Sequence, residues 1–139
     1  MRINKILVTL ILTFSLAGCD SENYGGVLTN NQIPQSVFNF IDQKDILDSK
    51  YIIAYYDVTI FLNNSESAIL TNKNIIYYKS GRVSKIPLNQ IKRIDYETDF
   101  SEYIYITPID GPMMTIEIAP LNGADVFIDL LKKEFKKNS

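Results

Sequence analysis

The pattern from residue 51 to residue 119 is typical of antiparallel β structure, with β-branched and aromatic runs separated by turn residues at short intervals. In the last of these runs, Met114, Ile116 and Ile118 alternate with Thr115 and Glu117. Successive side chains of a strand point to opposite faces, so this alternation predicts a sheet with one buried face. We expect seven strands, at residues 51–62, 67–71, 75–79, 82–86, 91–100, 103–108 and 113–119.

Turn residues divide these strands. Ser80 and Gly81 form a two-residue hairpin turn, and residues 63–66 close the first strand. Pro87 ends a strand because it cannot donate to a sheet ladder, and we expect a short helical turn at residues 88–91.

The period changes to a helical one near the end of the sequence. Phe127, Leu130, Leu131 and Phe135 recur at i, i+3, i+4 and i+8, which places them on one face of a helix. Asn122 precedes this stripe and is a good N-cap residue. We therefore predict an amphipathic C-terminal helix that packs on the sheet.

A weaker helical pattern precedes the strands. Apolar residues recur at near-helical spacing within residues 36–47, with Ser36 as the possible N-cap. The residues before this segment are small and polar, as in a tether. We expect a tether with a possible short helix at residues 19–44 and one domain at residues 45–139.

This order of elements resembles the bacterial pleckstrin-homology-like families. The resemblance implies a mainly β fold, a roll of about seven antiparallel strands capped by one amphipathic α-helix. It also implies a scaffold that binds proteins or peptides, or assembles with itself. Phosphoinositide recognition is not implied, because the loop at residues 62–66 carries no positive charge. The matching residues are Ala68-Ile69-Leu70-Thr71-Asn72, Ile75-Ile76-Tyr77-Tyr78, Gly81-Arg82-Val83, Ile86-Pro87-Leu88 and Ile91.

The first residues resemble a bacterial lipoprotein signal. A basic start is followed by an apolar segment at residues 6–16, which is too short to cross a bilayer. Leu16, Ala17 and Gly18 then match the signal-peptidase recognition site, and Cys19 matches the lipidated cysteine. We expect cleavage after residue 18 and fatty acyl chains such as palmitate on Cys19, which would hold the protein on a membrane. The alternative is an ordinary secretory signal followed by an unmodified cysteine.

Asp20 bears on the location. After a lipidated cysteine, aspartate resembles the signal that retains enteric lipoproteins in the inner membrane, facing the periplasm. In a Gram-negative cell we expect that location, with the outer membrane as the alternative. Asp20 is equally well explained as a polar linker residue.

Composition excludes several classes of function. The 139 residues contain one cysteine and no histidine, so a disulfide framework, a Ser-His or Cys-His pair and histidine metal sites are impossible. A formal charge of −2 argues against nucleic acid as a partner. We expect a non-enzymatic protein without a cofactor.

Two sets of residues are candidates for an interaction surface. Lys79, Arg82 and Lys85 surround a hairpin and could contact anionic headgroups, although charges there also keep a sheet edge from pairing. Tyr56 and Tyr78 belong to adjacent tyrosine pairs, in which one ring of each pair must point away from the core. These outward rings could form an aromatic recognition surface, or they could stack across strands and stabilise the roll.

Acidic residues offer a different chemistry. Asp95, Glu97 and Asp99 share one strand face near Glu102 and could attract Ca²⁺, but they lack the glycine and ordered loop of a calcium motif. Solvated strand charges explain them better. A carboxylate enzyme built on these residues, or on Asp57 and Glu117, is a third, weaker possibility.

The function that we expect is a lipid-anchored interaction module of the cell envelope. It would contact a protein partner, or associate with itself, at the membrane surface. The alternative is a periplasmic protein that handles lipids or small apolar ligands in a cavity of the roll. An enclosed cavity would favour the ligand-handling protein, and a fully packed core would contradict it.

Overall fold

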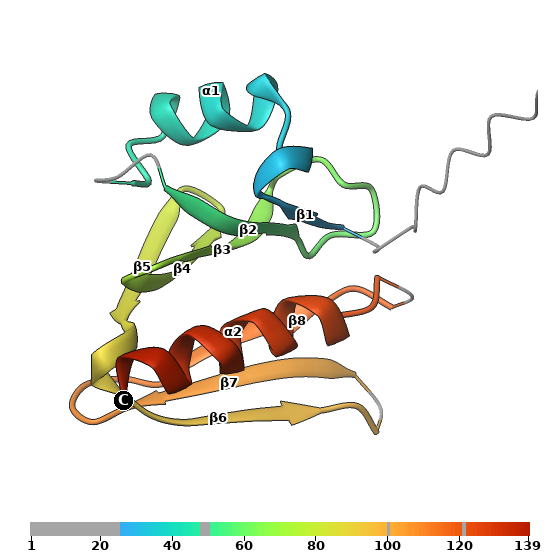
Figure 1. Cartoon of the computed structure of the whole chain (residues 1–139). Coiled ribbons are helices and arrows are strands. Elements are labelled where there is room, and N and C mark those ends of the chain that lie inside the picture. Colours follow the sequence, from blue (N-terminus) through green and yellow to red (C-terminus); the bar gives the residue numbers. More distant parts are fainter. Residues whose placement is uncertain (1–25, 48–50, 100, 121) are drawn as a thin grey trace, which may run out of the picture.

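Two antiparallel sheets face each other in the computed structural model, which describes residues 26–47, 51–99, 101–120 and 122–139 (Figure 1). The strands of each sheet follow one another in chain order, so each strand pairs with its sequence neighbours. The predicted signal and anchor residues, Leu16, Ala17, Gly18, Cys19 and Asp20, lie outside the described residues.

The first sheet has five strands and the second has three. The first contains β1 (Val27–Thr29), β2 (Ile52–Asp57), β3 (Glu66–Thr71), β4 (Asn74–Lys79) and β5 (Arg82–Pro87). The second contains β6 (Ile91–Glu97), β7 (Glu102–Pro108) and β8 (Met114–Ile118). The 3₁₀ turn η2 (Leu88–Gln90) joins the two sheets, which confirms the predicted helical turn after Pro87.

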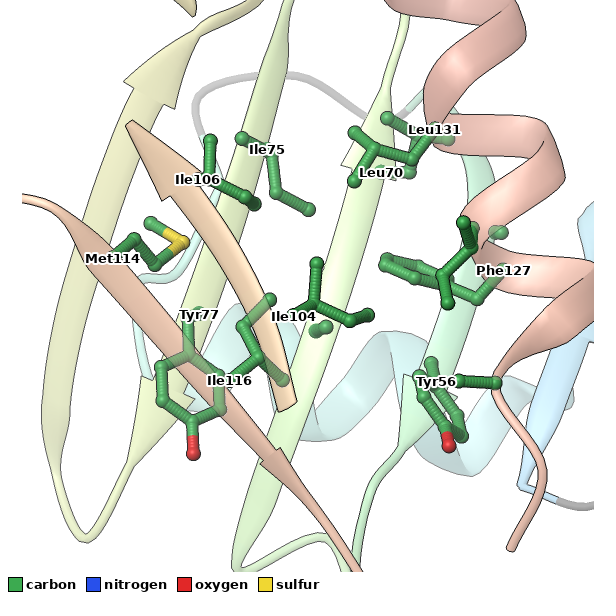
Figure 2. Close-up of a cluster of buried hydrophobic side chains, with 14 of the residues drawn as sticks. Tyr56, Leu70, Ile75, Tyr77, Ile104, Ile106, Met114, Ile116, Phe127 and Leu131 are labelled. Carbon is green, nitrogen blue, oxygen red and sulfur yellow. The ribbon is translucent and has the colours of Figure 1, made fainter. Parts of the chain in front are cut away.

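The main core lies between the two sheets and the C-terminal helix α2 (Asp125–Asn138). Figure 2 shows side chains from β7 and β8 facing side chains from β3 and β4, with Phe127 and Leu131 of α2 at one side. The predicted helical stripe is therefore correct, and Ile128 is buried with it. The labelled core residues are Tyr56, Leu70, Ile75, Tyr77, Ile104, Ile106, Met114, Ile116, Phe127 and Leu131.

A second core covers the opposite face of the first sheet. Helix α1 (Gln35–Gln43) lies over that face (Figure 1). Its buried Val37 and Ile41 pack with Tyr55, Ile69 and other buried side chains of β2 to β4. Because α1 covers this face and the main core covers the other, apolar area is removed from water on both sides of the first sheet.

Part of the predicted tether is regular structure. β1 pairs with β2, and the 3₁₀ turn η1 (Asn30–Gln32) connects β1 to α1. The N-cap of α1 is Pro34 rather than Ser36, because Pro34 is the last residue with extended dihedral angles before the helix. Residues 26–43 therefore belong to the folded unit.

The first predicted strand is shorter than expected, because β2 ends at Asp57. The Asp57 carboxylate accepts hydrogen bonds from the backbone N–H and the hydroxyl of Thr59, at 3.0 and 2.6 Å. It also accepts one from the backbone N–H of Asn64, at 2.6 Å. These bonds turn the chain into a loop at residues 58–65, so the apolar residues there do not extend the strand.

Asn122 does not cap α2, contrary to the prediction. The helix begins three residues later, with Ala124 at the N-cap. The buried Asn122 side chain instead accepts a hydrogen bond from the Gly26 N–H at 2.6 Å. It donates to the carbonyl oxygens of Asp57 and Thr59, at 2.8 and 3.1 Å.

Candidate interaction surfaces

The predicted aromatic surface is wrong, because Tyr56 and Tyr78 are both buried. Alternation does send neighbouring rings to opposite faces, but each face is covered. Tyr56 lies in the main core, 5.3 Å from Phe127 between ring centroids. Tyr78 lies beneath α1, where Phe40 meets it edge-on with centroids 5.3 Å apart and planes at 86°.

Burial also changes the acidity of two neighbouring tyrosines, Tyr55 and Tyr77. Desolvation raises the pKa of Tyr55 to about 12, and its hydroxyl donates to the Asn64 side chain at 2.6 Å. Burial first, and then the hydrogen bond to Glu66 at 2.9 Å, raise the pKa of Tyr77 above its ordinary value. Both hydroxyls therefore stay protonated at an alkaline pH where an exposed tyrosine would ionise, and both serve as hydrogen-bond donors.

The predicted basic surface divides into two parts. Lys79 is engaged within the domain, with Nζ 3.2 Å from Glu66 and 3.7 Å from Glu117. The second contact spans from β4 to β8, so it links the two sheets. Arg82 and Lys85 lie exposed on β5, the last strand of its sheet.

A groove runs between β5 and β8. β5 forms one edge of its sheet, and β8 forms an edge of the other. Two hollows, of about 360 and 430 Å³, share Ser84, Met113 and Met114 in their linings and so adjoin one another. Met113, beside β8, is 52% exposed and lines both hollows, and Ile86 of β5 contributes to the first of them. The groove therefore combines apolar side chains with the basic residues of β5.

The acidic residues singled out in the sequence are engaged separately. Asp95 forms an ion pair with Arg93 at 2.6 Å. Glu97 and Glu102 accept hydrogen bonds from the hydroxyls of Tyr105 and Tyr96, at 3.0 and 2.9 Å. Among the residues described, no three His, Cys, Asp or Glu side chains are grouped so that they could hold a metal ion.

The other two carboxylates proposed from the sequence occupy different surroundings. Asp57 is buried and is used by the loop that follows β2. Glu117 lies on β8, with its side chain 56% exposed, and contacts Lys79. The hydrogen-bond donors that the structure places at the Asp57 carboxylate belong to the loop at residues 58–65, so this carboxylate has a structural role.

One exposed apolar feature was missed by the sequence analysis. Ile60, Phe61 and Leu62 are 64%, 84% and 52% exposed, and we call these three residues the apolar tip. The tip follows β2 in the loop at residues 58–65. Its signal in the sequence is an unbroken apolar triplet just before the Asn63-Asn64 turn, where the alternation of a half-buried strand has stopped.

The apolar tip adjoins a hollow of about 620 Å³ at the same end of the roll. Ile60 contributes to its lining together with three carboxylates, Glu66, Glu102 and Glu117. This end of the molecule therefore combines apolar and acidic groups.

In the parts of the chain that the structure describes, no helix is long and apolar enough to span a membrane.

Comparison with known proteins identifies the fold. No protein-family model and no curated protein matches the chain. The fold is similar to the crystal structure of a DUF1696 family protein with a pleckstrin-homology domain from Shewanella loihica PV-4. The TM-score is 0.54 at 14% sequence identity, over 73% of this chain and 95% of that one. The chain thus has a mainly β, pleckstrin-homology-like fold with a C-terminal helix, as predicted.

Proposed function

We propose that this chain is a non-enzymatic, lipid-anchored module of the bacterial cell envelope that binds an extended, acidic segment of a protein partner. Cys19, at the end of a lipoprotein-type signal, would carry the anchor. The pleckstrin-homology-like roll would present the binding groove. A fold of this kind hosts many functions, so the proposal depends on the groove and not on the fold.

The groove between β5 and β8 is the observation that carries the proposal. An extended peptide can add to an exposed sheet edge through backbone hydrogen bonds, while side-chain pockets give specificity. β5 is such an edge, and the hollows beside it are lined by apolar side chains of both sheets. Pro87 ends the edge, which limits an added segment to the length of β5.

Charge favours a different protein over a second copy of the chain. Arg82 and Lys85 lie exposed on β5. If two β5 strands paired with each other, these cations would be brought together, and like charges across an interface are costly. A segment with Asp or Glu among apolar residues would complement both the cations and Met113.

Crosslinking in native membranes tests the groove. A photoreactive residue, p-benzoylphenylalanine, would replace Ser84 of β5, which lines both hollows, or, as a control, Lys133 on the exposed side of α2. We expect an adduct with another envelope protein from position 84 alone. Charge reversal by Arg82→Glu should reduce that adduct several-fold. Equal adducts from both positions, or an adduct that survives the charge reversal, would contradict the groove, and adducts only with the chain itself would replace the partner by self-association.

Detergent partition tests the anchor separately. We expect the mature protein to enter the detergent phase of a Triton X-114 extract and to carry acyl chains by mass spectrometry. The Cys19→Ala variant should stay in the aqueous phase. If both proteins partition alike and the mature protein has an unmodified cysteine, the anchoring part of the proposal is wrong.

A further inference from the structure

The apolar tip is held in one conformation by its own loop. Leu62 and Asn64 have φ angles of 48° and 60°, in the left-handed region that non-glycine residues seldom adopt. The Asp57 carboxylate accepts from the N–H groups of Thr59 and Asn64, which closes the loop beneath the tip. Ile60 and Phe61 are therefore displayed outward by this loop, while the half-exposed Leu62 lies beside Gly26.

The tip lies beside Gly26, the residue that precedes β1. A Cβ placed on Gly26 would lie 3.0 Å from Cδ2 of Leu62. Gly26 is fixed at this point, because its N–H donates to the Asn122 side chain and its carbonyl accepts from the Asp57 N–H at 3.0 Å.

Covalent geometry limits how far Gly26 can lie from the lipid anchor on Cys19. Gly26 follows Cys19 by seven positions, and a fully extended chain spans at most about 3.6 Å per residue, or roughly 25 Å in total. A membrane that holds acyl chains on Cys19 is therefore always within about 25 Å of Gly26. Leu62 of the tip lies beside Gly26, so the tip is also held near that membrane.

We propose that the apolar tip inserts into the surface of the same membrane that holds Cys19. This inference rests on the proposed lipid anchor and adds a second point of contact, which fixes how the roll is oriented on the bilayer. Tethering makes even a weak second contact effective, because it becomes an intramolecular event at high effective concentration.

The interaction is apolar rather than electrostatic. The loop at residues 58–65 carries no basic residue, and Glu66, Glu102 and Glu117 line the hollow beside it. The loop itself therefore offers anionic headgroups no cation, and Lys79, the cation beside it, is paired with Glu66 and Glu117. Large apolar side chains at the boundary of headgroups and acyl chains gain by leaving water, whatever the headgroup charge.

Tryptophan fluorescence tests the insertion, because the chain has no tryptophan of its own. Phe61→Trp places one reporter in the tip. Ile109→Trp is the matched control, because Ile109 is 56% exposed and donates to the Gln90 carbonyl at 2.7 Å, beside η2 at the other end of the roll (Figure 1). Each lipidated full chain would be reconstituted into phosphatidylcholine vesicles, with or without bromine atoms on the acyl chains.

We expect a shift to shorter wavelength and several-fold stronger quenching by brominated chains for Phe61→Trp than for Ile109→Trp. Adding phosphatidylglycerol should not increase the quenching. Thermal unfolding of both variants should match that of the parent, since both sites are exposed. A requirement for the anionic lipid would contradict an apolar contact.

The remaining outcomes separate the tip from the anchor. If the lipidated protein floats with the vesicles but neither variant is quenched, the insertion is wrong and the anchor stands. If the protein carries no lipid, the Phe61→Trp response to added vesicles decides: a response supports the insertion without the anchor, and its absence overturns it. If the emission of Phe61→Trp shifts with an envelope extract but not with vesicles, the tip contacts a protein and the membrane insertion is wrong.

Discussion

At the scale of single residues, two buried polar side chains organise one end of the roll: Asp57 ends β2, and Asn122 joins the start of β1 to the end of β2. Asp57 and Asn122 lie at the same end of the roll, where Asn122 donates to the Asp57 carbonyl. Buried polar groups cost free energy unless they are hydrogen-bonded, and both are satisfied by backbone groups of nearby loops. Asn122 is 96 positions from Gly26 and 65 from Asp57, so the residues around Asn122 in the sequence could not predict these hydrogen bonds.

Replacing Asn122 tests this role. Asn122→Ala should lower the free energy of unfolding by about 3 kcal/mol, because three hydrogen bonds are lost and the buried Gly26 N–H is left without its partner. Urea denaturation measures the loss. Hydrogen exchange should also become faster across β1, since Gly26 anchors its start.

Asn138→Ala is the matched control for this substitution. Its side chain makes a single hydrogen bond, to the Glu134 carbonyl at the end of α2. We expect a loss below about 1 kcal/mol, because frayed helix ends contribute little. A loss from Asn122→Ala no larger than that from Asn138→Ala would show that the junction adds no stability.

At the scale of elements, periodicity predicted what depends on local pattern. The strands β3 to β8, the η2 turn and the C-terminal helix lie within a few residues of their expected positions. What periodicity could not predict is which faces are covered. Tyr78 faces away from the main core, as alternation requires, yet α1 buries it. The pattern of α1 shows that one of its faces is apolar but not what that face meets.

The same limit applies to the candidate sites. The residues of the β5 edge, Arg82 and Lys85, were found because charges beside a hairpin turn are visible in the sequence. The groove was not found, since its other wall comes from β8 and the turn before it. The apolar tip was assigned to a strand, because the hydrogen bonds of Asp57 that end β2 cannot be read from hydrophobicity.

Removing the N-terminal elements tests whether α1 and β1 belong to the folded unit. A fragment of residues 45–139, the domain expected from the sequence, lacks them and should expose Tyr55, Ile69 and neighbouring side chains of the first sheet. We expect it to bind the dye ANS and to aggregate, because large exposed apolar patches associate. A fragment of residues 26–139 should be soluble and unfold cooperatively. Cooperative unfolding of the shorter fragment would mean that the roll is stable without its outer layer.

At the scale of the whole molecule, the tyrosines with raised pKa values should make stability fall at alkaline pH. Tyrosines are distributed over both sheets, and burial raises the pKa of Tyr55 to about 12 from an ordinary value of 10.0. Burial, followed by hydrogen bonding to Glu102, raises the pKa of Tyr96 to about 12 in the same way. Each folded ring stays protonated at a pH where its unfolded counterpart loses a proton.

The sign of the resulting pH dependence follows from that difference. Below pH 10 both states keep the proton, so the tyrosines leave the free energy of unfolding constant. Between pH 10 and about 12 the unfolded state releases protons and the folded state does not, so stability falls as pH rises. For Tyr55 we expect a loss of roughly 2 kcal/mol over this range.

Comparison with Tyr55→Phe isolates this contribution. At pH 8 the variant should be less stable than the parent, because its hydrogen bond to Asn64 is gone. Between pH 9 and 12 the parent should lose roughly 2 kcal/mol relative to the variant, since only the parent has this proton to lose. Urea denaturation at several pH values gives both curves. A constant difference across the range would mean that Tyr55 ionises at its ordinary pKa.

The order of strands in the first sheet has a mechanical consequence. β1 lies at one edge of this sheet, next to the point where the chain arrives from Cys19, and β5 lies at the other edge. If a lipid holds the first edge and a partner pulls on the second, the tension crosses every strand-to-strand ladder in turn. The three-residue β1 is the shortest strand in that series. The hydrogen bonds of Gly26 to the Asn122 side chain and to the Asp57 N–H then add to the ladder that resists the detachment of β1, so Asn122 would raise the force that the module withstands at the membrane.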